Sequence, residues 1–202
     1  MRGGVMRIGS TGGIGSGKST VTGHIIDRGY QVLAEDKIAR QIVLPGEPAL
    51  ARLIEAFGPG ILGKDGAQDR KKLAALTIGD PESVKLMNDI MHGEIYDIMM
   101  DGLLHPESDP VFADVPLLFE TGFEKDLDKV WLVTAAGEIR IKRVEQRDGE
   151  PRDHIVARMK RQMPEEERMK KADVIIENDR PLEELYSKVD ALLEETHENN
   201  RK

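Results

Sequence analysis

Short apolar runs alternate with amphipathic stretches along this chain, and this alternation predicts a parallel α/β fold. Five apolar runs are typical of buried strands: residues 5–9, 31–34, 111–115, 130–133 and 174–176. Because helical patterns separate these runs, we expect a doubly wound parallel five-stranded sheet with right-handed crossovers.

Apolar residues three and four positions apart predict the helices. The predicted helices cover residues 18–27, 49–57, 70–76, a stretch from residue 81 onward, 139–146, 153–163 and 182–193. Asp69 and Asp80 are expected to cap two of them, and Pro81 follows as a first helical residue. The helix after Pro81 carries four of the nine methionines: Met87, Met91, Met99 and Met100. These methionines either fill a core or form an adaptable wall for a flexible ligand.

The length of 202 residues fits one compact α/β domain with insertions or a core with small appended lobes, and 39% hydrophobic and 33% charged positions are ordinary for a globular protein. The net charge of −8 argues against nonspecific nucleic-acid binding, which needs basic surface. Zero cysteines exclude disulfides, thiolate metal sites and cysteine nucleophiles. No apolar run approaches the roughly 18 residues of a membrane span, and the start does not have the pattern of a signal peptide. We therefore expect a cytoplasmic protein without a membrane partner, with disorder only in residues 198–202.

A glycine-rich loop follows the first predicted strand. Residues 12–19 fit the pattern G-x-x-x-x-G-K-[ST], and a helix is predicted directly after it. Glycines let backbone amides surround phosphate oxygens, Lys18 would reach the β- and γ-phosphates, and Ser19 would coordinate Mg²⁺. The residues expected around the nucleotide are Gly13, Ile14, Gly15, Ser16, Gly17, Lys18, Ser19 and Thr20. This P-loop predicts a site for ATP with Mg²⁺, but kinases, switches and motors all share it.

Positive charge gathers in the last third of the chain. Residues 140–171 hold eleven basic and seven acidic side chains, a net +4 within a chain of −8. An arginine-rich lid over a transferring phosphoryl group would use such charge. An ordinary solvated helical face would look the same in composition.

Asp36, two residues past a predicted strand, and Asp114, at the end of another, are expected at the carboxyl edge of the sheet, where open α/β folds bind ligands. Asp36 is either a base for an acceptor hydroxyl or the N-cap of a helix over residues 37–43. Asp114 is either an acid for Mg²⁺ or part of a strand-end turn.

The motifs resemble one family, dephospho-CoA kinase, from about residue 8 to residue 193. The matching segments are residues 11–20, 36–40, Asp69-Arg70-Lys71 with Leu73, His92, Asp114-Val115-Pro116-Leu117-Leu118-Phe119-Glu120, Gln146-Arg147-Asp148, Arg158 with Gln162, and residues 172–178. The resemblance implies a P-loop kinase of coenzyme A biosynthesis. It would phosphorylate the ribose 3′-hydroxyl of 3′-dephospho-CoA with ATP and Mg²⁺.

The resemblance also implies roles for individual residues. Asp36 would be the catalytic base, while Lys18 and Arg147 would stabilise the transferring phosphate. Asn178 would lie near the adenine of ATP. The residues that would hold dephospho-CoA, besides Asp36, are Arg40, His92, Leu117, Leu118 and Phe119.

The same resemblance divides residues 1–202, a single kinase unit, into parts. The core would comprise residues 5–44, 108–136 and 172–197. Residues 45–107 would form a helical substrate-binding insertion, and residues 137–171 a helical lid. Nothing in the sequence specifies the oligomeric state or decides between Met1 and Met6 as the natural start.

Four positions depart from the family pattern, and two of them are Ser10, in place of a usual leucine before the P-loop, and Arg180, in place of a common glycine after residues 172–178. Ala34 stands where the family has the first acid of a D-x-D pair, and Gly93 replaces the proline after His92, which should loosen a turn there. The P-loop and lid residues are intact, so we expect an active enzyme. Another small P-loop kinase of the nucleotide kinase type and a non-catalytic nucleotide switch remain the alternatives.

Overall fold

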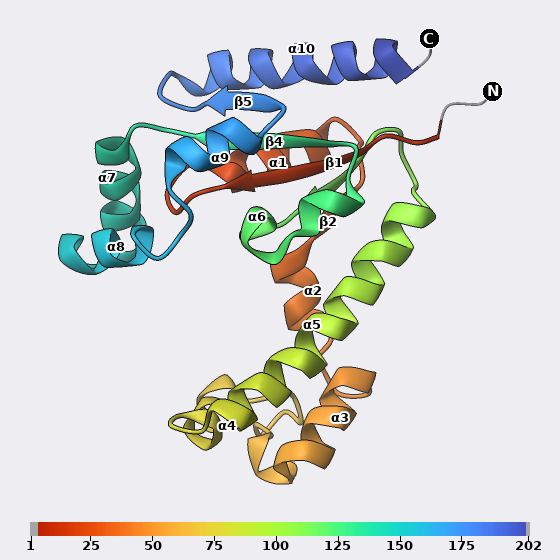
Figure 1. The fold of residues 1–202 in the computed structure, drawn as a ribbon, viewed down its shortest axis with the longest axis vertical. Helices are drawn as coiled ribbons and strands as arrows, with labels where there is room; N and C mark the ends of the chain where they lie inside the picture. The colour runs from red at the N-terminus through yellow and green to blue at the C-terminus, as the bar shows by residue number, and fades with distance from the viewer. Residues whose placement is uncertain (1–3, 201–202) are drawn as a thin grey trace. The chain divides into compact units, whose positions relative to one another are not determined.

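A computed structural model describes residues 4–200, and it contains a five-stranded sheet (Figure 1). The strands are β1 (Arg7–Gly12), β2 (Val32–Ala34), β3 (Val111–Asp114), β4 (Lys129–Thr134) and β5 (Val174–Glu177). Their order is β2-β3-β1-β4-β5, and β1 pairs in parallel with both β3 and β4. The predicted doubly wound α/β class is confirmed, with β1 at the middle of the sheet.

Helices connect the strands in the predicted alternation. The α-helices are α1 (Lys18–Asp27), α2 (Glu35–Gln41), α3 (Pro48–Phe57), α4 (Arg70–Thr77), α5 (Pro81–Leu104), α6 (Leu118–Thr121), α7 (Gly137–Asp148), α8 (Arg152–Met159), α9 (Glu165–Lys171) and α10 (Leu182–Asn200). Two short 3₁₀ helices are η1 (Pro59–Ile61) and η2 (Phe123–Asp126). Asp69 caps α4 as predicted, since its carboxylate accepts from the backbone of Lys71 at 2.9 Å.

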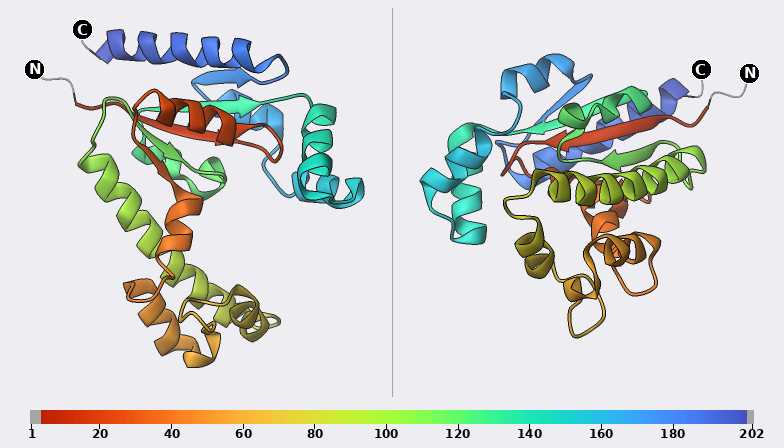
Figure 2. Two further views of the ribbon diagram at one scale, coloured as in Figure 1. Left: turned by 180° about the vertical axis from the view of Figure 1, so that it is seen from behind. Right: turned by 60° about the horizontal axis from the view of Figure 1, so that its bottom comes forward.

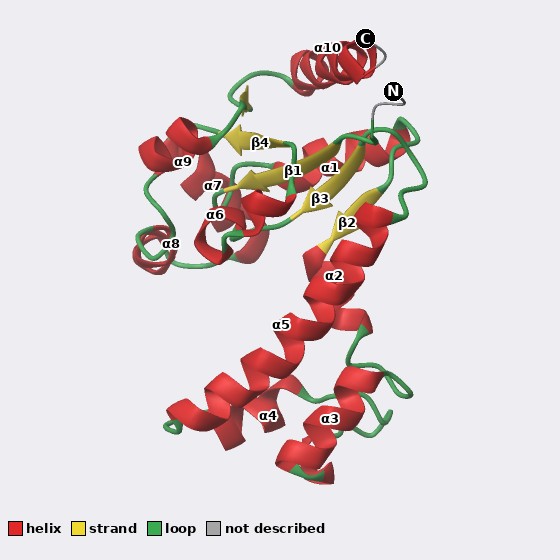
Figure 3. Cartoon of the chain, turned by 45° about the vertical axis from the view of Figure 1, so that its right-hand side comes forward, coloured by secondary structure: helices red, strands yellow, loops and turns green. Residues whose placement is uncertain are grey.

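The chain forms two compact units. The first comprises the chain up to Leu33 and from His105 onward, and the second is Ala34–Leu104. Within the second unit, α2, α3 and α4 all pack against the long helix α5 (Figure 3).

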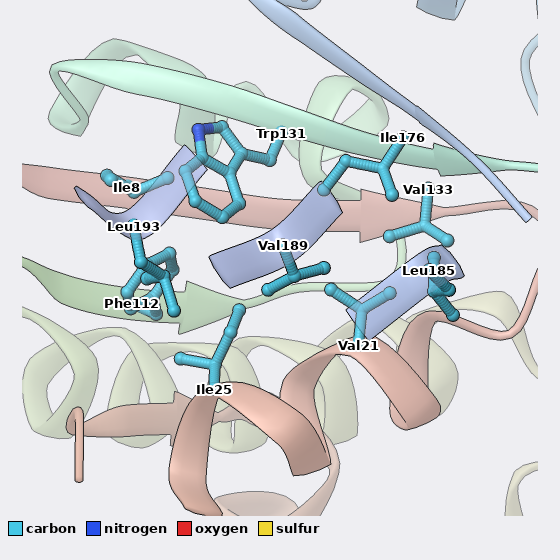
Figure 4. Close-up of a cluster of buried hydrophobic side chains, with 10 residues drawn as sticks. All are labelled: Ile8, Val21, Ile25, Phe112, Trp131, Val133, Ile176, Leu185, Val189 and Leu193. Carbon is cyan, nitrogen blue, oxygen red and sulfur yellow. The ribbon is translucent and has the colours of Figure 1, made fainter. Parts of the chain in front are cut away.

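One part of the core lies between the sheet and two helices of the first unit, α1 and α10 (Figure 4). Its buried side chains are Ile8, Val21, Ile25, Phe112, Trp131, Val133, Ile176, Leu185, Val189 and Leu193. Each large apolar side chain buried here contributes about 1.5–3 kcal/mol. On the other sheet face, a Cβ at Gly9 would come 2.6 Å from Leu118, so glycine lets α6 approach β1 closely. The core therefore fixes the strand and helix that flank the glycine-rich loop.

Two of the differences from the sequence prediction concern β1 and the helix that follows α7. β1 continues through Ser10 and Thr11 to Gly12, because β3 and β4 pair with it on both sides and keep it extended. The helix predicted over residues 153–163 ends at Met159, and the separate helix α9 begins after Pro164. Proline disfavours helical backbone in the residue before it, here Met163, so α8 and α9 cannot form one continuous helix.

Two expectations about flexible segments are wrong. Residues 198–200, expected to be disordered, belong to α10, while residues 201–202 lie outside the described part. Gly93 lies inside the continuous helix α5, so no turn exists there for it to loosen. The apolar stripe along α5 overrides the weak helix propensity of one glycine.

Asp190 of α10 links that helix to the end of α1. Its carboxylate accepts a hydrogen bond from Arg28 Nε at 2.7 Å and lies 2.8 Å from His24 Nε2. The His24 ring stacks on Tyr186, with 4.0 Å between ring centroids. The hydrogen bond from the Arg28 guanidinium lowers the pKa of Asp190 below its ordinary value.

We expect Asp190→Asn to lower the melting temperature by a few degrees at neutral pH. A carboxyl group whose pKa is lowered by folding stabilises the protein above its unfolded-state pKa. That contribution disappears as pH falls through the folded-state pKa, below about pH 4. Thermal unfolding of both proteins across this range should therefore show the difference shrinking at low pH. A constant difference would contradict an electrostatic origin.

Candidate functional site

The glycine-rich loop joins β1 to α1 in a backbone conformation that requires glycine. Gly15 and Gly17 have φ values of +75° and +88°, which strain any residue with a side chain. A Cβ at Gly12 would come 2.6 Å from Ser16 Oγ and 2.6 Å from the carbonyl oxygen of Val133. These steric limits explain the glycine spacing that the sequence shows.

Side chains from α7 and from the end of β5 donate hydrogen bonds to two backbone carbonyls of this loop, those of Ile14 and Ser16. Arg140 Nε donates to the Ile14 carbonyl at 2.8 Å. Asn178 Nδ2 donates to the Ser16 carbonyl at 2.9 Å, and Arg143 Nη1 donates to the same oxygen at 3.4 Å. Because these contacts hold the loop in one conformation, little ordering is needed when phosphate binds.

The segment after α8 also forms a hydrogen bond with this loop. Gln162 Oε1 accepts a hydrogen bond from the Ile14 backbone amide at 3.0 Å. The Ile14 side chain packs against a small cluster in which Ile141, Val144 and Ile155 are buried. This cluster joins α7 to α8, which lie side by side (Figure 2). The helices of the predicted lid are thus attached to the phosphate loop within one compact unit.

A buried charged cluster lies against the start of the loop. Glu165 accepts from Arg140 Nη1 at 2.8 Å and also binds Arg168 and the Thr134 hydroxyl. Burial, reinforced by the nearby charge of Arg168, lowers the pKa of Arg140, and Glu165 opposes that shift. A Cβ at Gly13 would come 2.6 Å from Arg168 Nη2. The cluster therefore places two arginines and one glutamate next to the start of the loop, near Gly13.

Lys18, the first residue of α1, forms an ion pair with Asp114 at the end of β3. Both side chains are largely buried, with exposed fractions of 16% and 12%. Ser19 follows Lys18 and is exposed. The adjoining β1 and β3 bring these groups to the same edge of the sheet.

The oxygen donors at this edge fit Mg²⁺ that arrives with a nucleotide. Mg²⁺ prefers oxygen ligands and usually combines one or two protein groups with substrate phosphates. The Ser19 hydroxyl and the Asp114 carboxylate are groups of this kind. Among residues 4–200, no group of three or more His, Asp and Glu side chains could hold a metal alone. Phosphate oxygens would therefore have to complete the ligand set.

Arg147, expected in the lid, is at the end of α7 and is exposed. Its guanidinium donates to both oxygens of Asp148 at 2.7 Å. This pairing raises the pKa of Arg147 and lowers that of Asp148. The pair lies in solvent, where such interactions are weak. An anionic ligand could therefore compete with Asp148 for the guanidinium.

The residues expected to hold the acceptor, Asp36, Arg40 and His92, are exposed and belong to the second unit. Asp36 lies in the first turn of α2, whose N-cap is Ala34. The N-cap explanation for Asp36 is therefore wrong, and its role in chemistry stays a prediction. The second unit also contains a cavity of about 410 Å³, which His92 helps to line.

The segment Leu117-Leu118-Phe119, also expected at the acceptor, is mostly packed inside. Leu118 and Phe119 are 0% and 6% exposed, whereas Leu117 is 44% exposed. Of these three residues, Leu117 alone is exposed enough to contact a ligand without rearrangement.

Sequence reasoning did not single out Arg140, Arg143, Glu165 or Arg168 as parts of the site. One signal pointed to α9: the acidic residues 165–167 are followed by the basic residues Arg168, Lys170 and Lys171, a charge order that favours a helix. Nothing local shows that Glu165 meets Thr134 and Arg140. These contacts join residues 31 and 25 positions apart.

Asn178 donates a hydrogen bond to the Ser16 carbonyl, so replacing it should affect nucleotide binding differently from the loss of a contact to adenine. We expect Asn178→Ala to weaken ATP binding about tenfold, the usual effect of losing one buried hydrogen bond. Binding of inosine triphosphate should weaken by the same factor, because that hydrogen bond acts on the phosphate loop. Calorimetric titration with both nucleotides would measure this. If Asn178 contacts the base, the ratio of the two affinities would change instead.

The chain is similar to one family over nearly all of its length. The family model for dephospho-CoA kinase matches residues 6–184. A dephospho-CoA kinase of Corynebacterium glutamicum is 39% identical over 194 residues, covering 95% of this chain and 100% of the relative. The crystal structure of TT1252 from Thermus thermophilus has a TM-score of 0.79 and 39% identity, covering 95% of this chain and 97% of that one. A dephospho-CoA kinase structure from Campylobacter jejuni has a TM-score of 0.67 and 27% identity, covering 94% and 96%.

Proposed function

Because this chain belongs to the dephospho-CoA kinase family, we propose that it transfers the γ-phosphoryl group of ATP to the ribose 3′-hydroxyl of 3′-dephospho-CoA. The products are ADP and CoA, and the reaction is the last step of CoA biosynthesis. The observation that carries this proposal is that the family match spans both compact units. It includes the phosphate loop and the segment expected to hold the acceptor.

The transfer forms a bond between the ribose 3′-oxygen and the γ-phosphorus and breaks the bond to the β,γ-bridging oxygen. Asp36 would accept the proton of the 3′-hydroxyl as the new bond forms. Negative charge spreads over the phosphoryl oxygens in the transition state. Lys18 from the P-loop and Arg147 from the lid would stabilise that charge.

The remaining residues would bind the two substrates. The backbone of residues 13–20 would hold the ATP phosphates, and Arg40, His92 and Leu117 would contact dephospho-CoA. Ser19 and Asp114 would hold Mg²⁺, which neutralises phosphate charge when it is bound. None of the helices described in residues 4–200 has the length and apolar character of a membrane span. Both proposed substrates are small molecules.

The experiment that tests this function is ADP release from Mg-ATP with and without 3′-dephospho-CoA, with the product mass measured in parallel. We expect ADP to form only with the acceptor, and the acceptor to gain one phosphoryl group at the 3′-position. Phosphorylation of a different nucleotide in preference to dephospho-CoA would favour another small kinase. Slow ATP turnover that no acceptor changes would favour a nucleotide switch.

A further inference from the structure

Gly13 is a glycine for a reason that differs from the other glycines of the phosphate loop. Gly15 and Gly17 have positive φ values, whereas Gly13 does not. The general pattern of the loop leaves the residue at position 13 open. A Cβ at Gly13 would collide with the guanidinium of Arg140 and come 2.6 Å from Arg168 Nη2. The missing side chain therefore lets two arginines approach the backbone at the start of the loop.

Both arginines are buried and share one acidic partner. Arg140 and Arg168 are 4% and 3% exposed. Within residues 4–200, the acid that pairs with both of them is Glu165. One oxygen of its carboxylate accepts from Arg140 Nη1 at 2.8 Å and also from Arg168 Nη2, and the other oxygen accepts from the Thr134 hydroxyl. The cluster therefore holds two positive charges and one negative charge.

One positive charge of this cluster has no counter-charge among the ion pairs of residues 4–200. Burial lowers the pKa of Arg140, and the neighbouring charge of Arg168 adds to that shift, although Glu165 opposes it. Arg168 Nε is also buried, and it has no hydrogen-bond partner in the described part of the chain. Because a buried charge without an equal opposite charge is costly, an anion bound nearby would stabilise the cluster.

The cluster is in contact with the loop whose backbone would surround the phosphates of a nucleotide. Arg140 Nε donates to the Ile14 carbonyl at 2.8 Å, and a Cβ at Gly15 would collide with the backbone carbonyl of Arg140. Interactions between charges act over several ångströms and are strong where water is excluded. ATP carries more negative charge than ADP, because it has one more phosphoryl group. An excess positive charge buried beside the loop therefore favours ATP over ADP.

We propose that Arg140 and Arg168, joined by Glu165, are positioning residues that hold the start of the phosphate loop and make it select the nucleoside triphosphate over the diphosphate. They act through the loop and through their charge, without touching the reacting atoms. This selection would favour the release of ADP after phosphoryl transfer. The inference deepens the proposed function, on which it rests for the identity of the nucleotide.

The test is calorimetric titration of MgATP and of MgADP, without an acceptor, into the 202-residue protein and its variants. Arg168→Met removes one positive charge, so the ratio of ATP affinity to ADP affinity should fall about tenfold. Glu165→Gln removes the negative charge that both arginines share, so the ratio should rise. We expect a rise of about threefold, because the Glu165 side chain is 26% exposed. A purely structural contact would not give shifts of opposite sign, since both substitutions break the same ion pair.

Lys170→Met is the matched control for the loss of charge. It removes the same charge from the same helix, α9, but Lys170 is exposed, so water and salt screen its charge. The ratio should stay at the value of the unmodified protein. Arg168→Lys keeps the charge but not the planar guanidinium, so it should lower the melting temperature and keep most of the ratio. If Arg168→Met does not fold, the direction of the Glu165→Gln shift decides.

An unchanged ratio in folded Arg168→Met, or a fall of the ratio in both cluster variants, would overturn the selection by charge. An equal loss of affinity for both nucleotides would overturn it as well. The assay of ADP release with dephospho-CoA tests the proposed function separately. The expected ratios without transfer to dephospho-CoA would overturn that function alone, and a protein that binds neither nucleotide would overturn both.

Discussion

Replacing Lys18 by alanine should lower kcat by about a hundredfold or more, which is the usual effect of removing one electrostatic stabiliser of a transition state. Lys18 is fixed at the start of α1 and ion-paired with Asp114. Its ammonium is therefore already ordered at the edge of the sheet where the phosphates would bind. Steady-state kinetics with saturating ATP and dephospho-CoA would measure the loss.

The Lys18–Asp114 pair makes a stability control necessary. Removing Lys18 leaves the largely buried Asp114 carboxylate without its ammonium partner, so Lys18→Ala should also lower the melting temperature. A Lys18→Met, Asp114→Asn double variant removes both charges and should recover much of the stability. Its turnover should stay low. Turnover near the parent value in either folded variant would contradict the role of Lys18 in catalysis.

Asp36→Asn is expected to lower kcat by about 10²–10⁴-fold, the range associated with a positioned general base. ATP affinity should be nearly unchanged, because Asp36 is proposed to serve the acceptor hydroxyl. Asp36 is exposed in the first turn of α2 and is not its cap, so the isosteric asparagine should leave the fold intact. Kinetics and ATP titration on the same preparation separate the two effects. An equal loss of ATP affinity would place Asp36 in the nucleotide or metal shell.

Ala34→Asp is the informative companion variant, since Ala34 stands where the resembling family has the first acid of its pair. Ala34 is the N-cap of α2 and makes no side-chain hydrogen bond to the helix. An aspartate there should accept a hydrogen bond from the first helical turn and stabilise the protein by about 0.5–2 kcal/mol. Little change in kcat would show that Asp36 suffices for the chemistry. A large gain in kcat would show that both acids are needed.

Part of the molecule could be predicted because its determinants are local. The helix over residues 18–27 was predicted with its observed bounds, since a glycine loop precedes it and Gly29, with φ of +87°, follows it. The cap at Asp69 is also local, because its side chain accepts hydrogen bonds from the backbone of Lys71 and Lys72, two and three residues away. The alternation of apolar runs and helical patterns was enough to predict the fold class, and the order of the motifs along the chain was enough to predict the family.

Other features depend on contacts between distant parts of the chain. Local pattern ended β1 at Gly9, but pairing with two neighbouring strands extends it to Gly12. Asn178 was assigned to the vicinity of adenine from resemblance, yet its carboxamide reaches the Ser16 carbonyl, 162 positions earlier. No spacing rule within a sequence encodes such a pair.

The sequence by itself determined that this chain has a phosphate-binding loop between a strand and a helix, on a parallel sheet, in a member of the dephospho-CoA kinase family. Glycine conformations, caps and hydrophobic periodicity act over a few residues, so they can be recognised without a structure. Only the tertiary structure decided that Arg140, Arg143 and Asn178 brace the loop and that Met87 and Met91 line a cavity. Those outcomes follow from the packing of helices and strands that are remote along the chain.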